Sequence, residues 1–181
     1  MILVTGGSGY IGSHSILKLL KKNYEIISLD NYSNSSSKIY NNIQSLTKKK
    51  INFIKGDLRD STILRKIFSN FKIEAVLHFA GLKSINESYQ KPFDYFSNNL
   101  MGSVNLINEM SNANINKILF SSSATVYGNN HPLPWKEDLK LNLPSSPYAQ
   151  TKILVEDFLS SKYLANNEWS IGILRYFNPV G

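Results

Sequence analysis

The stretch ILVTGGSGYIG, residues 2–12, decides the fold of this 181-residue chain. It begins with a short apolar run, residues 2–4, of the kind that forms a buried strand, and glycines end this run. Two glycine patterns overlap after it, Gly7-x-Gly9-x-x-Gly12 and Gly6-x-x-Gly9-x-x-Gly12. Either pattern keeps side chains away from the backbone where a pyrophosphate meets the N-terminus of a helix. The stretch therefore predicts a strand, a tight turn and a helix that together bind a dinucleotide.

An acidic residue follows in the position that such a unit requires. Residues 25–29 form the second predicted strand, and Asp30 ends it. Asp30 lies about twenty residues beyond the glycines, where a carboxylate binds the ribose hydroxyls of the dinucleotide. A carboxylate there would repel a 2′-phosphate, so the sequence favours NAD over NADP. The alternative is that Asp30 only caps the loop that follows the strand.

Strands and helices alternate through the rest of the chain. Further strands are predicted at residues 51–54, 75–79, 117–121 and 170–175, and helices at residues 11–22, 39–49, 60–68, 92–110 and 147–164. This alternation implies right-handed βαβ units and a parallel sheet. We expect a doubly wound α/β fold, a Rossmann domain spanning residues 1–181. Residues 128–147 hold four prolines, and the length of this expected loop suggests a functional role.

The composition excludes several classes of protein. The chain is 42% hydrophobic and has no cysteine, so disulfides, thiolate catalysis and cysteine metal sites are excluded. It has no apolar run long enough to cross a bilayer, and its N-terminus lacks the basic region of a signal peptide. We therefore expect a cytoplasmic protein without a membrane partner.

Charged residues and histidines indicate no further partner. The net charge is +7, but the lysines are spread out and only residues 48–50 form a run of three. This pattern favours a solvated surface with mild attraction for phosphates over nucleic-acid binding. The three histidines are scattered, so we expect no metal site. Glu137 and Asp138 lie in the proline-rich loop, where we expect solvated side chains rather than a catalytic pair.

The chemistry is expected from two later stretches, SSSATVYG at residues 121–128 and YAQTK at residues 148–152. Tyr148 and Lys152 are four residues apart, so a helix places them on one face. A nearby ammonium lowers the pKa of a phenol, which ordinarily stays protonated until about pH 10. Ser123 would arrive from the end of a strand to hold the reacting oxygen. Tyr-x-x-x-Lys also occurs by chance in many helices, as a packed ring beside a solvated lysine.

Taken together, these motifs resemble the UDP-glucose 4-epimerase family of extended short-chain dehydrogenases/reductases. The resemblance covers nearly the whole chain and is carried by LVTGGSGYIGSH (3–14), LDN (29–31), GDLRD (56–60), HFAGLKSINES (78–88), QKPFDYFSNNLMG (90–102), SSSATVYG (121–128), SPYAQTK (146–152) and LRYFNPVG (174–181). Ala149 stands where the family usually shows glycine. The chain is similar to the N-terminal portion of the family only, so most of the substrate domain is expected to be missing.

The resemblance implies roles for individual residues. NAD would be bound along its pyrophosphate, adenosine and nicotinamide parts by Gly6, Gly9, Tyr10, Ile11, Gly12, Asp30, Asn31, Asp57, Leu58, Phe79, Ala80, Gly81, Lys83, Asn98, Ser121, Tyr148, Lys152 and Tyr176. The catalytic set would be Tyr148, Lys152 and Ser123. The substrate would contact Lys83, Ser123, Tyr148, Phe177 and Asn178.

The resemblance also implies a reaction, the interconversion of UDP-glucose and UDP-galactose by oxidation and reduction at sugar C4, as part of galactose metabolism. Tyr148 would act as the base, with its pKa lowered by Lys152 and by the charge of the nicotinamide. The full-length protein would form a homodimer through the helices at residues 92–110 and 147–164. We expect little or no activity from the isolated chain.

Three alternatives stay open from the sequence. One is a 4-epimerase for UDP-N-acetyl-hexosamines, since the residues that decide N-acetyl specificity are not present. Another is a 4,6-dehydratase, which would need an acid pair where this chain has Ser123-Ala124-Thr125. The third is a non-catalytic fragment that binds NAD.

Overall fold

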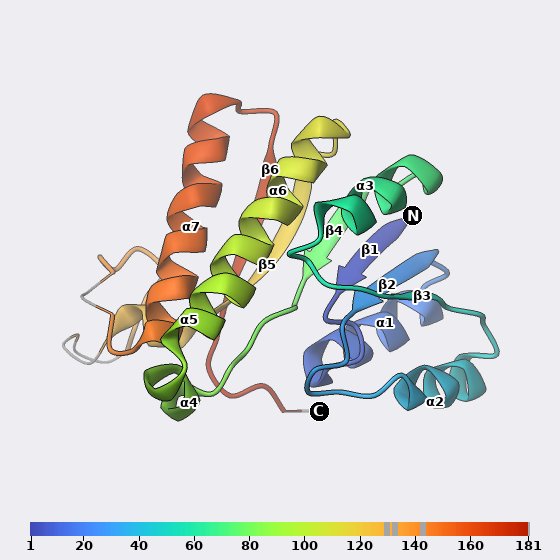
Figure 1. The fold of residues 1–181 in the computed structure, drawn as a ribbon, viewed down its shortest axis with the longest axis horizontal. Coiled ribbons are helices and arrows are strands. Elements are labelled where there is room, and N and C mark those ends of the chain that lie inside the picture. Colours follow the sequence, from blue (N-terminus) through green and yellow to red (C-terminus); the bar gives the residue numbers. More distant parts are fainter. Residues whose placement is uncertain (129–130, 132–133, 142–143, 181) are drawn as a thin grey trace.

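A six-stranded parallel sheet forms the centre of the computed structural model, which describes residues 1–128, 131, 134–141 and 144–180 (Figure 1). The strands follow the order β3-β2-β1-β4-β5-β6 across the sheet. Every neighbouring pair is parallel. The strands are β1 (Ile2–Thr5), β2 (Ile26–Asp30), β3 (Asn52–Lys55), β4 (Ala75–His78), β5 (Lys117–Ser123) and β6 (Ser170–Tyr176). The predicted doubly wound fold is therefore confirmed.

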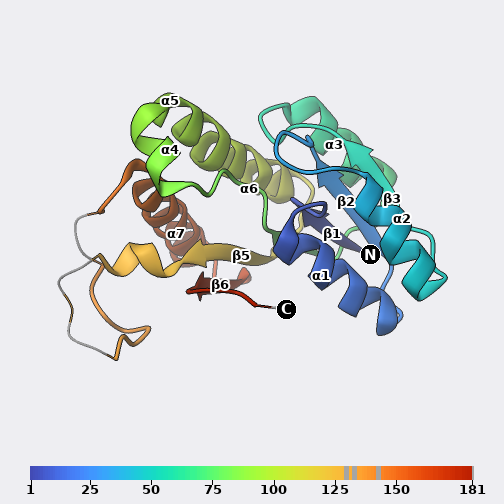
Figure 2. The same ribbon diagram turned by 90° about the horizontal axis from the view of Figure 1, so that it is seen from below.

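Helices lie on both faces of this sheet, as the edge-on view in Figure 2 shows. One face is covered by α3 (Ser61–Asn70), α6 (Gly102–Asn112) and α7 (Pro147–Ala165), and the other by α1 (Tyr10–Lys21) and α2 (Lys38–Thr47). The short helices α4 (Ile85–Gln90) and α5 (Pro92–Tyr95) follow β4, and the 3-10 helix η2 (Ala124–Tyr127) follows β5.

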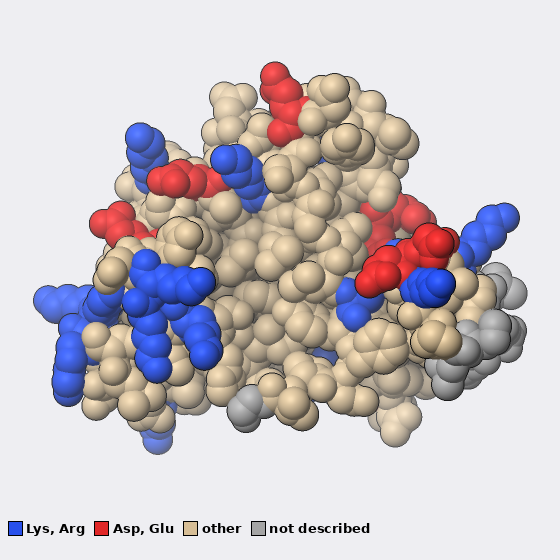
Figure 3. All heavy atoms as spheres, turned by 180° about the vertical axis from the view of Figure 1, so that it is seen from behind, with Lys and Arg blue, Asp and Glu red and all other residues tan. Residues whose placement is uncertain are grey.

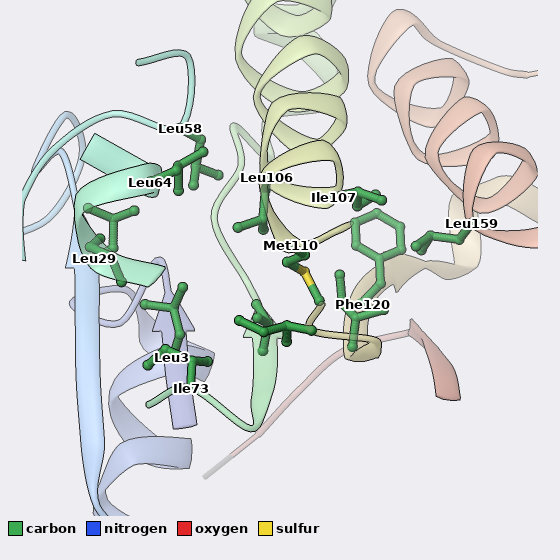
Figure 4. Packing of buried hydrophobic residues seen from close by; sticks show 14 of the residues in the cluster. Leu3, Leu29, Leu58, Leu64, Ile73, Leu106, Ile107, Met110, Phe120 and Leu159 are labelled. Atoms are coloured by element: carbon green, nitrogen blue, oxygen red, sulfur yellow. The ribbon is translucent and has the colours of Figure 1, made fainter. Parts of the chain in front are cut away.

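The larger of the hydrophobic clusters lies between the sheet and the layer of α3, α6 and α7. Figure 4 shows Leu106, Ile107 and Met110 of α6 between Leu64 of α3 and Leu159 of α7. All five side chains are fully buried, and each such burial contributes on the order of 1.5–3 kcal/mol. This packing holds α7 against β5, and α7 carries the predicted Tyr148 and Lys152.

The predicted helix at residues 92–110 is present as uninterrupted helical structure, with a π-helical segment that was not predicted. The structure divides this stretch into α5, a π-helical segment η1 (Phe96–Met101) and α6. Helix α4 was not predicted at all, although Ser84 caps it by accepting a hydrogen bond from the backbone N–H of Glu87. The described positions of the proline-rich stretch after residue 128 form no helix or strand until α7 begins. Residues 129–130, 132–133 and 142–143 of that expected loop, and Gly181, lie outside the described residues.

Lysines that are distant in sequence meet at one end of the molecule. Figure 3 shows Lys and Arg side chains gathered at one side of the rear face. Lys18, Lys21 and Lys22 belong to the C-terminal end of α1 and are exposed. The Lys48–Lys50 run reaches the same place, because Lys49 donates hydrogen bonds to the Leu20 carbonyl and the Asn23 side chain. The lysines are thus less dispersed in space than in sequence. Within the described part of the chain, no helix is long and apolar enough to span a membrane.

Candidate active site

A cavity of about 660 Å³ opens at the carboxyl ends of the strands. Strand order reverses between β1 and β4, and ligands of doubly wound sheets bind at such a switch point. All the residues predicted above as catalytic, cofactor-binding or substrate-binding line this one cavity. They come from the ends of strands, from the loops that follow, from η1 and from the starts of α1 and α7, so the fold brings together residues from position 6 to position 178.

The glycine loop after β1 is shaped by backbone contacts that admit no side chain. Gly6 has a φ of +68°, and a Cβ there would lie 2.6 Å from the backbone nitrogen of Ala80. A Cβ on Gly12 would lie 2.2 Å from the Gly6 carbonyl oxygen. Gly7 excludes a side chain for a different reason, because an added Cβ would lie 2.0 Å from the Ser28 hydroxyl on β2. The wider pattern, Gly6-x-x-Gly9-x-x-Gly12, therefore shapes the loop, and Gly7 permits close packing.

Gly9 marks the N-terminus of α1 and faces the cavity. It is the N-cap residue and has no capping side chain. A Cβ there would come within 4 Å of one heavy atom, the Gly6 carbonyl oxygen at 3.3 Å. The first backbone N–H groups of any helix lack partners inside it and favour anions. The loop thus fits a pyrophosphate that approaches without a side chain in the way.

Asp30 ties the glycine loop to the segment after β2. Its Oδ2 accepts a hydrogen bond from the Ser8 backbone N–H at 3.0 Å. Its Oδ1 accepts from the Tyr32 backbone N–H at 2.9 Å and from the Ser35 hydroxyl at 3.2 Å. Ser35 also lines the cavity and was not predicted, because a short polar loop offers no spacing that singles out one serine.

Asp57 belongs to the same wall of the cavity. It accepts hydrogen bonds from the Asn31 side chain at 3.0 Å and from the Arg59 guanidinium at 2.7 Å. The bond with Arg59 is the main cause that lowers the pKa of Asp57, so this carboxylate is ionised at neutral pH. Asn31 and Asp57 are therefore hydrogen-bonded to each other in the wall of the cavity that also holds Asp30 and Leu58, where the resemblance implies adenosine.

The loop after β4 is held in place by Asn99, a buried residue in η1. The Asn99 Oδ1 accepts a hydrogen bond from the Leu82 backbone N–H at 2.8 Å, and its Nδ2 donates to the Leu82 carbonyl at 2.9 Å. This pair of bonds sets the path of Gly81 and Lys83 along the cavity. The neighbouring Asn98, which was predicted, lines the cavity and donates to Asn99 at 3.0 Å. Asn99 was missed because burial of a polar side chain is not visible in a local pattern.

Tyr148 stands in the first turn of α7 and hydrogen-bonds Ser123 at the end of β5. Ser146 caps this helix by accepting a bond from the Ala149 backbone N–H at 3.1 Å, and Pro147 occupies its first position. Thr125 donates to the Ser123 hydroxyl at 3.0 Å through its own hydroxyl. The predicted Tyr148 and Ser123 are thus in contact, with Thr125 as a partner that the sequence did not single out.

Lys152 is buried one turn below Tyr148. Its Nζ donates a hydrogen bond to the Ser121 carbonyl oxygen at 2.7 Å. It lies 4.8 Å from the centre of the Phe120 ring and 5.8 Å from the centre of the Tyr148 ring. Burial lowers the pKa of Lys152 to about 8, and the charge of Glu156 acts in the opposite direction.

The pKa of Tyr148 departs from the expectation. Burial raises it, and the hydrogen bond with Ser123 opposes that effect only in part. The expected lowering by Lys152 is not found, because the ammonium is directed at the Ser121 carbonyl rather than at the phenol oxygen. Tyr148 is therefore a protonated phenol in this arrangement, and it would need a further positive charge nearby to act as a base at neutral pH.

The remaining predicted residues lie at the open end of the cavity. Tyr176, the last residue of β6, lines it together with Phe177 and Asn178, which follow the strand. Phe177 is 60% exposed and its ring lies 5.8 Å from that of Trp135 and 6.5 Å from that of Tyr127. Glu137 and Asp138 are exposed, as expected. Among the described residues, no group of three His, Asp or Glu side chains is placed to hold a metal.

Comparisons with known proteins agree with this geometry. The model of the NAD dependent epimerase/dehydratase family matches residues 2–181. The UDP-glucose 4-epimerase of Neisseria meningitidis serogroup C is 47% identical over 180 residues, which cover 99% of this chain and 53% of that protein. The crystal structure of UDP-glucose 4-epimerase from Bifidobacterium longum, in complex with NAD+ and UDP, has a TM-score of 0.97 and 42% identity, covering 99% of this chain and 54% of that one.

A further solved structure is the UDP-Glc/GlcNAc 4-epimerase from Campylobacter jejuni, with a TM-score of 0.92 and 36% identity. The match covers 98% of this chain and 53% of that one. The chain spans about half the length of the curated relatives it matches.

Proposed function

Because the chain belongs to the NAD dependent epimerase/dehydratase family, we propose that the protein acts as an NAD-dependent 4-epimerase that interconverts UDP-glucose and UDP-galactose. The observation that carries this proposal is the shared cavity, which collects a phosphate-binding glycine loop, Asp30 and the Tyr148–Ser123 pair. Residues 1–181 would form its NAD-binding domain. The identity to UDP-glucose 4-epimerases supports this choice of substrate.

The chain offers a complete cradle for the cofactor. Gly6, Gly9 and Gly12 admit the pyrophosphate, and Asp30 would bind the adenosine ribose. Asp57 and Leu58 would hold the adenine, while Lys152 would hold the nicotinamide ribose. The fit is supported by Gly9, which lines the cavity at the helix N-terminus and places no side chain between the backbone and the cofactor. When bound, NAD supplies the hydride acceptor for sugar C4 and a positive charge beside Tyr148.

Tyr148 and Ser123 would divide the proton chemistry between them. Tyr148 would take the proton of the sugar 4-hydroxyl and later return it. Ser123 would hold the reacting oxygen, since its hydroxyl already bonds Tyr148. The partner hydroxyl of Thr125 would keep Ser123 in this orientation. Lys83, Phe177 and Asn178 line the open end of the cavity and would contact the nucleotide sugar.

The substrate and the type of reaction each leave one alternative to the proposed enzyme. A relative named for both UDP-Glc and UDP-GlcNAc has the same fold, so UDP-N-acetyl-hexosamines are the second candidate substrates. A dehydratase is less well supported, because Ala124 and Thr125 occupy the positions where an acid pair would be needed.

Assembly and location complete the proposal. We place the protein in the cytoplasm and expect a homodimer of the whole protein through the helices of residues 92–110 and 147–164. Exposed apolar side chains on these helices support the dimer, since Phe93 is 80% exposed, Met101 52% and Leu164 84%. Light scattering coupled to gel filtration would measure it, and Phe93→Glu should weaken it.

The function is tested with the whole purified protein, since little or no activity is expected from the 181-residue chain alone. It is incubated with NAD and UDP-galactose, and UDP-glucose is detected by a coupled dehydrogenase. Binding of NAD is measured separately by calorimetry. Tyr148→Phe should lower turnover by about 10²-fold or more and leave NAD affinity within a few fold. Turnover of UDP-N-acetylgalactosamine alone would reassign the substrate. A protein that binds NAD without turning over either sugar would instead be a cofactor-binding module, and unchanged turnover in Tyr148→Phe would overturn the proposed mechanism.

A further inference from the structure

One face of α7 contacts the end of β5 at three successive turns. Tyr148 hydrogen-bonds the Ser123 side chain, and Lys152 donates to the Ser121 carbonyl. Glu156, one turn further on, accepts a hydrogen bond from the Ser122 hydroxyl. The three α7 residues are spaced by four, so they lie in one row along the helix. Consecutive serines of β5 are therefore each bound to one residue of this row.

Glu156 is the most firmly held member of the row. It is 3% exposed and forms a bidentate ion pair with Arg175 of β6, with Nη2 2.8 Å from Oε2 and Nε 3.2 Å from Oε1. Arg175 is the register partner of Ser122 on the neighbouring strand. Two adjacent strands thus present a hydroxyl and a guanidinium to the same carboxylate.

Arg175 extends this anchor beyond α7. Its Nη1 donates to the Tyr127 hydroxyl at 3.2 Å and to the Glu137 carbonyl at 3.0 Å. Tyr127 belongs to the 3-10 helix that contains Thr125, the partner of Ser123. The pair therefore links α7, β5, β6 and the turn that carries the site hydroxyls.

The charges around Lys152 show what Glu156 contributes besides hydrogen bonds. His78 of β4 is buried, and burial lowers its pKa to about 3, so it is neutral at pH 7. Tyr148 and Tyr95, whose rings meet edge to face at 6.4 Å, have raised pKa values because of burial and are neutral as well. Among these described neighbours, Glu156 is the carboxylate that offsets the buried ammonium, while Arg175 faces Glu156 from the other side.

From this geometry we propose that Glu156 is a positioning residue. Anchored by Arg175 and Ser122, it fixes the register of α7 on β5 and supplies the negative charge that balances Lys152 in the interior. Its importance for catalysis rests on the proposed function, in which Tyr148, Ser123 and Lys152 act together. Its effect on Lys152 is a property of the chain alone and can be measured without substrate.

The test follows the titration of Lys152 by NMR in protein labelled with carbon-13 at the lysine Cε, with the signal assigned by its loss in Lys152→Arg. Glu156→Gln removes the charge and keeps the size of the side chain. The midpoint of the Lys152 titration should fall by about half a pH unit or more. Arg175→Gln removes the competing positive charge, so the midpoint should rise. The Lys152 midpoint should thus shift in opposite directions in the two variants, and a general loosening of the structure would not produce opposite shifts.

Glu109→Gln is the matched control. Glu109 is 5% exposed and pairs with Arg65 at 3.4 Å, but it lies on α6 and outside the row. It should leave the Lys152 midpoint unchanged. If Glu156→Gln does not fold, the upward shift in Arg175→Gln carries the test when its amide NMR spectrum shows the packing unchanged, because exposure of Lys152 to water would also raise the midpoint. An unchanged or oppositely shifted midpoint in the folded variants would refute the role of Glu156. NAD binding by the unmodified protein is recorded in parallel, so that a failure of the proposed function is seen separately.

Discussion

The ammonium group of Lys152 donates a hydrogen bond to the backbone carbonyl of Ser121, 2.7 Å away, and so joins α7 to the end of β5. This contact places a positive charge in the interior of the chain, 6% exposed, with Tyr148 one turn away on the same helix. The bond makes Lys152 part of the fold as well as part of the candidate site, and its protonation therefore affects stability.

Lys152 should make stability depend on pH in the alkaline range. Its folded-state pKa is about 8 against an ordinary 10.5, so between these values the unfolded chain binds more protons and stability rises with pH. Relative to Lys152→Met, the free energy of unfolding should increase by about 3 kcal/mol from pH 8 to pH 10.5. Urea unfolding of both proteins at several pH values measures the difference, and a flat or falling difference would contradict the lowered pKa.

Two glycines of the same loop should respond differently to alanine. In Gly12→Ala the Cβ would lie 2.2 Å from the Gly6 carbonyl, and a clash between backbone-bound atoms should cost several kcal/mol, on the order of 2–4. In Gly9→Ala the Cβ would lie 3.3 Å from the same carbonyl oxygen, a tight contact that a small shift of the loop relieves, so the chain should fold and lose much less stability than Gly12→Ala. Its new methyl group faces the cavity and should weaken NAD binding at least about tenfold. Equal losses of stability in the two variants would contradict this division of roles.

Two helix caps allow stability to be separated from activity. Ser146 caps α7 next to Tyr148, whereas Asp60 caps α3 and accepts from the Thr62 backbone N–H at 2.9 Å. Either residue replaced by alanine should lower the free energy of unfolding by about 1 kcal/mol. Only Ser146→Ala should also lower the turnover of the proposed epimerase, because it frees the first turn that positions the phenol. The comparison uses thermal unfolding and the coupled UDP-galactose assay; a similar loss of turnover in Asp60→Ala would argue against it.

Ser123 should contribute to turnover through its bond with Tyr148. Ser123→Ala removes the hydrogen bond that lowers the pKa of Tyr148, so the effect of burial is unopposed and this pKa should rise. Turnover should fall by about 10²-fold. Absorbance of the ionised phenol at alkaline pH, compared with Tyr148→Phe, measures the shift. Thr125→Val is the companion variant, since it removes the donor to Ser123 at 3.0 Å and keeps Ser123 itself. It should have a smaller effect in the same direction.

Most of the fold could be predicted because its signals are local. The six strands are short apolar runs ended by glycine or polar residues, and the glycine loop identified the unit that begins the sheet. Even the missed helix α4 has a local signal, since Ser84 and Glu87 form the Ser-x-x-Glu spacing of a capping box. The π-helical segment has none, because a π-turn is a rare single turn inside an α-helix and is not marked by a residue pattern of its own.

The chemistry of the site was less predictable for a physical reason. The glycines, Asp30 and Tyr148 belong to recognisable spacings, whereas Asn99 and Glu156 act through partners 17 and 19 residues away, Leu82 and Arg175. The raised pKa of Tyr148 follows from burial, which depends on the packed structure and not on neighbours in sequence. The order of residues therefore indicated that the glycines, Asp30 and Tyr148 belong to one site, but neither the buried partners that hold the site nor the protonation state of Tyr148.

Strand β6 is the outermost strand of the described sheet and pairs with β5 alone. Its far side thus has no strand partner among the described residues, and the N–H and C=O groups that alternate residues of Ser170–Tyr176 point to that side are not bonded to a further strand. An open strand of this length is a template for edge-to-edge pairing with another polypeptide. The opposite rim is β3, four residues long, whose Lys55 is exposed and discourages such pairing. Self-association of the 181-residue chain is therefore expected to begin along β6, and a lysine introduced on that rim should keep preparations monodisperse.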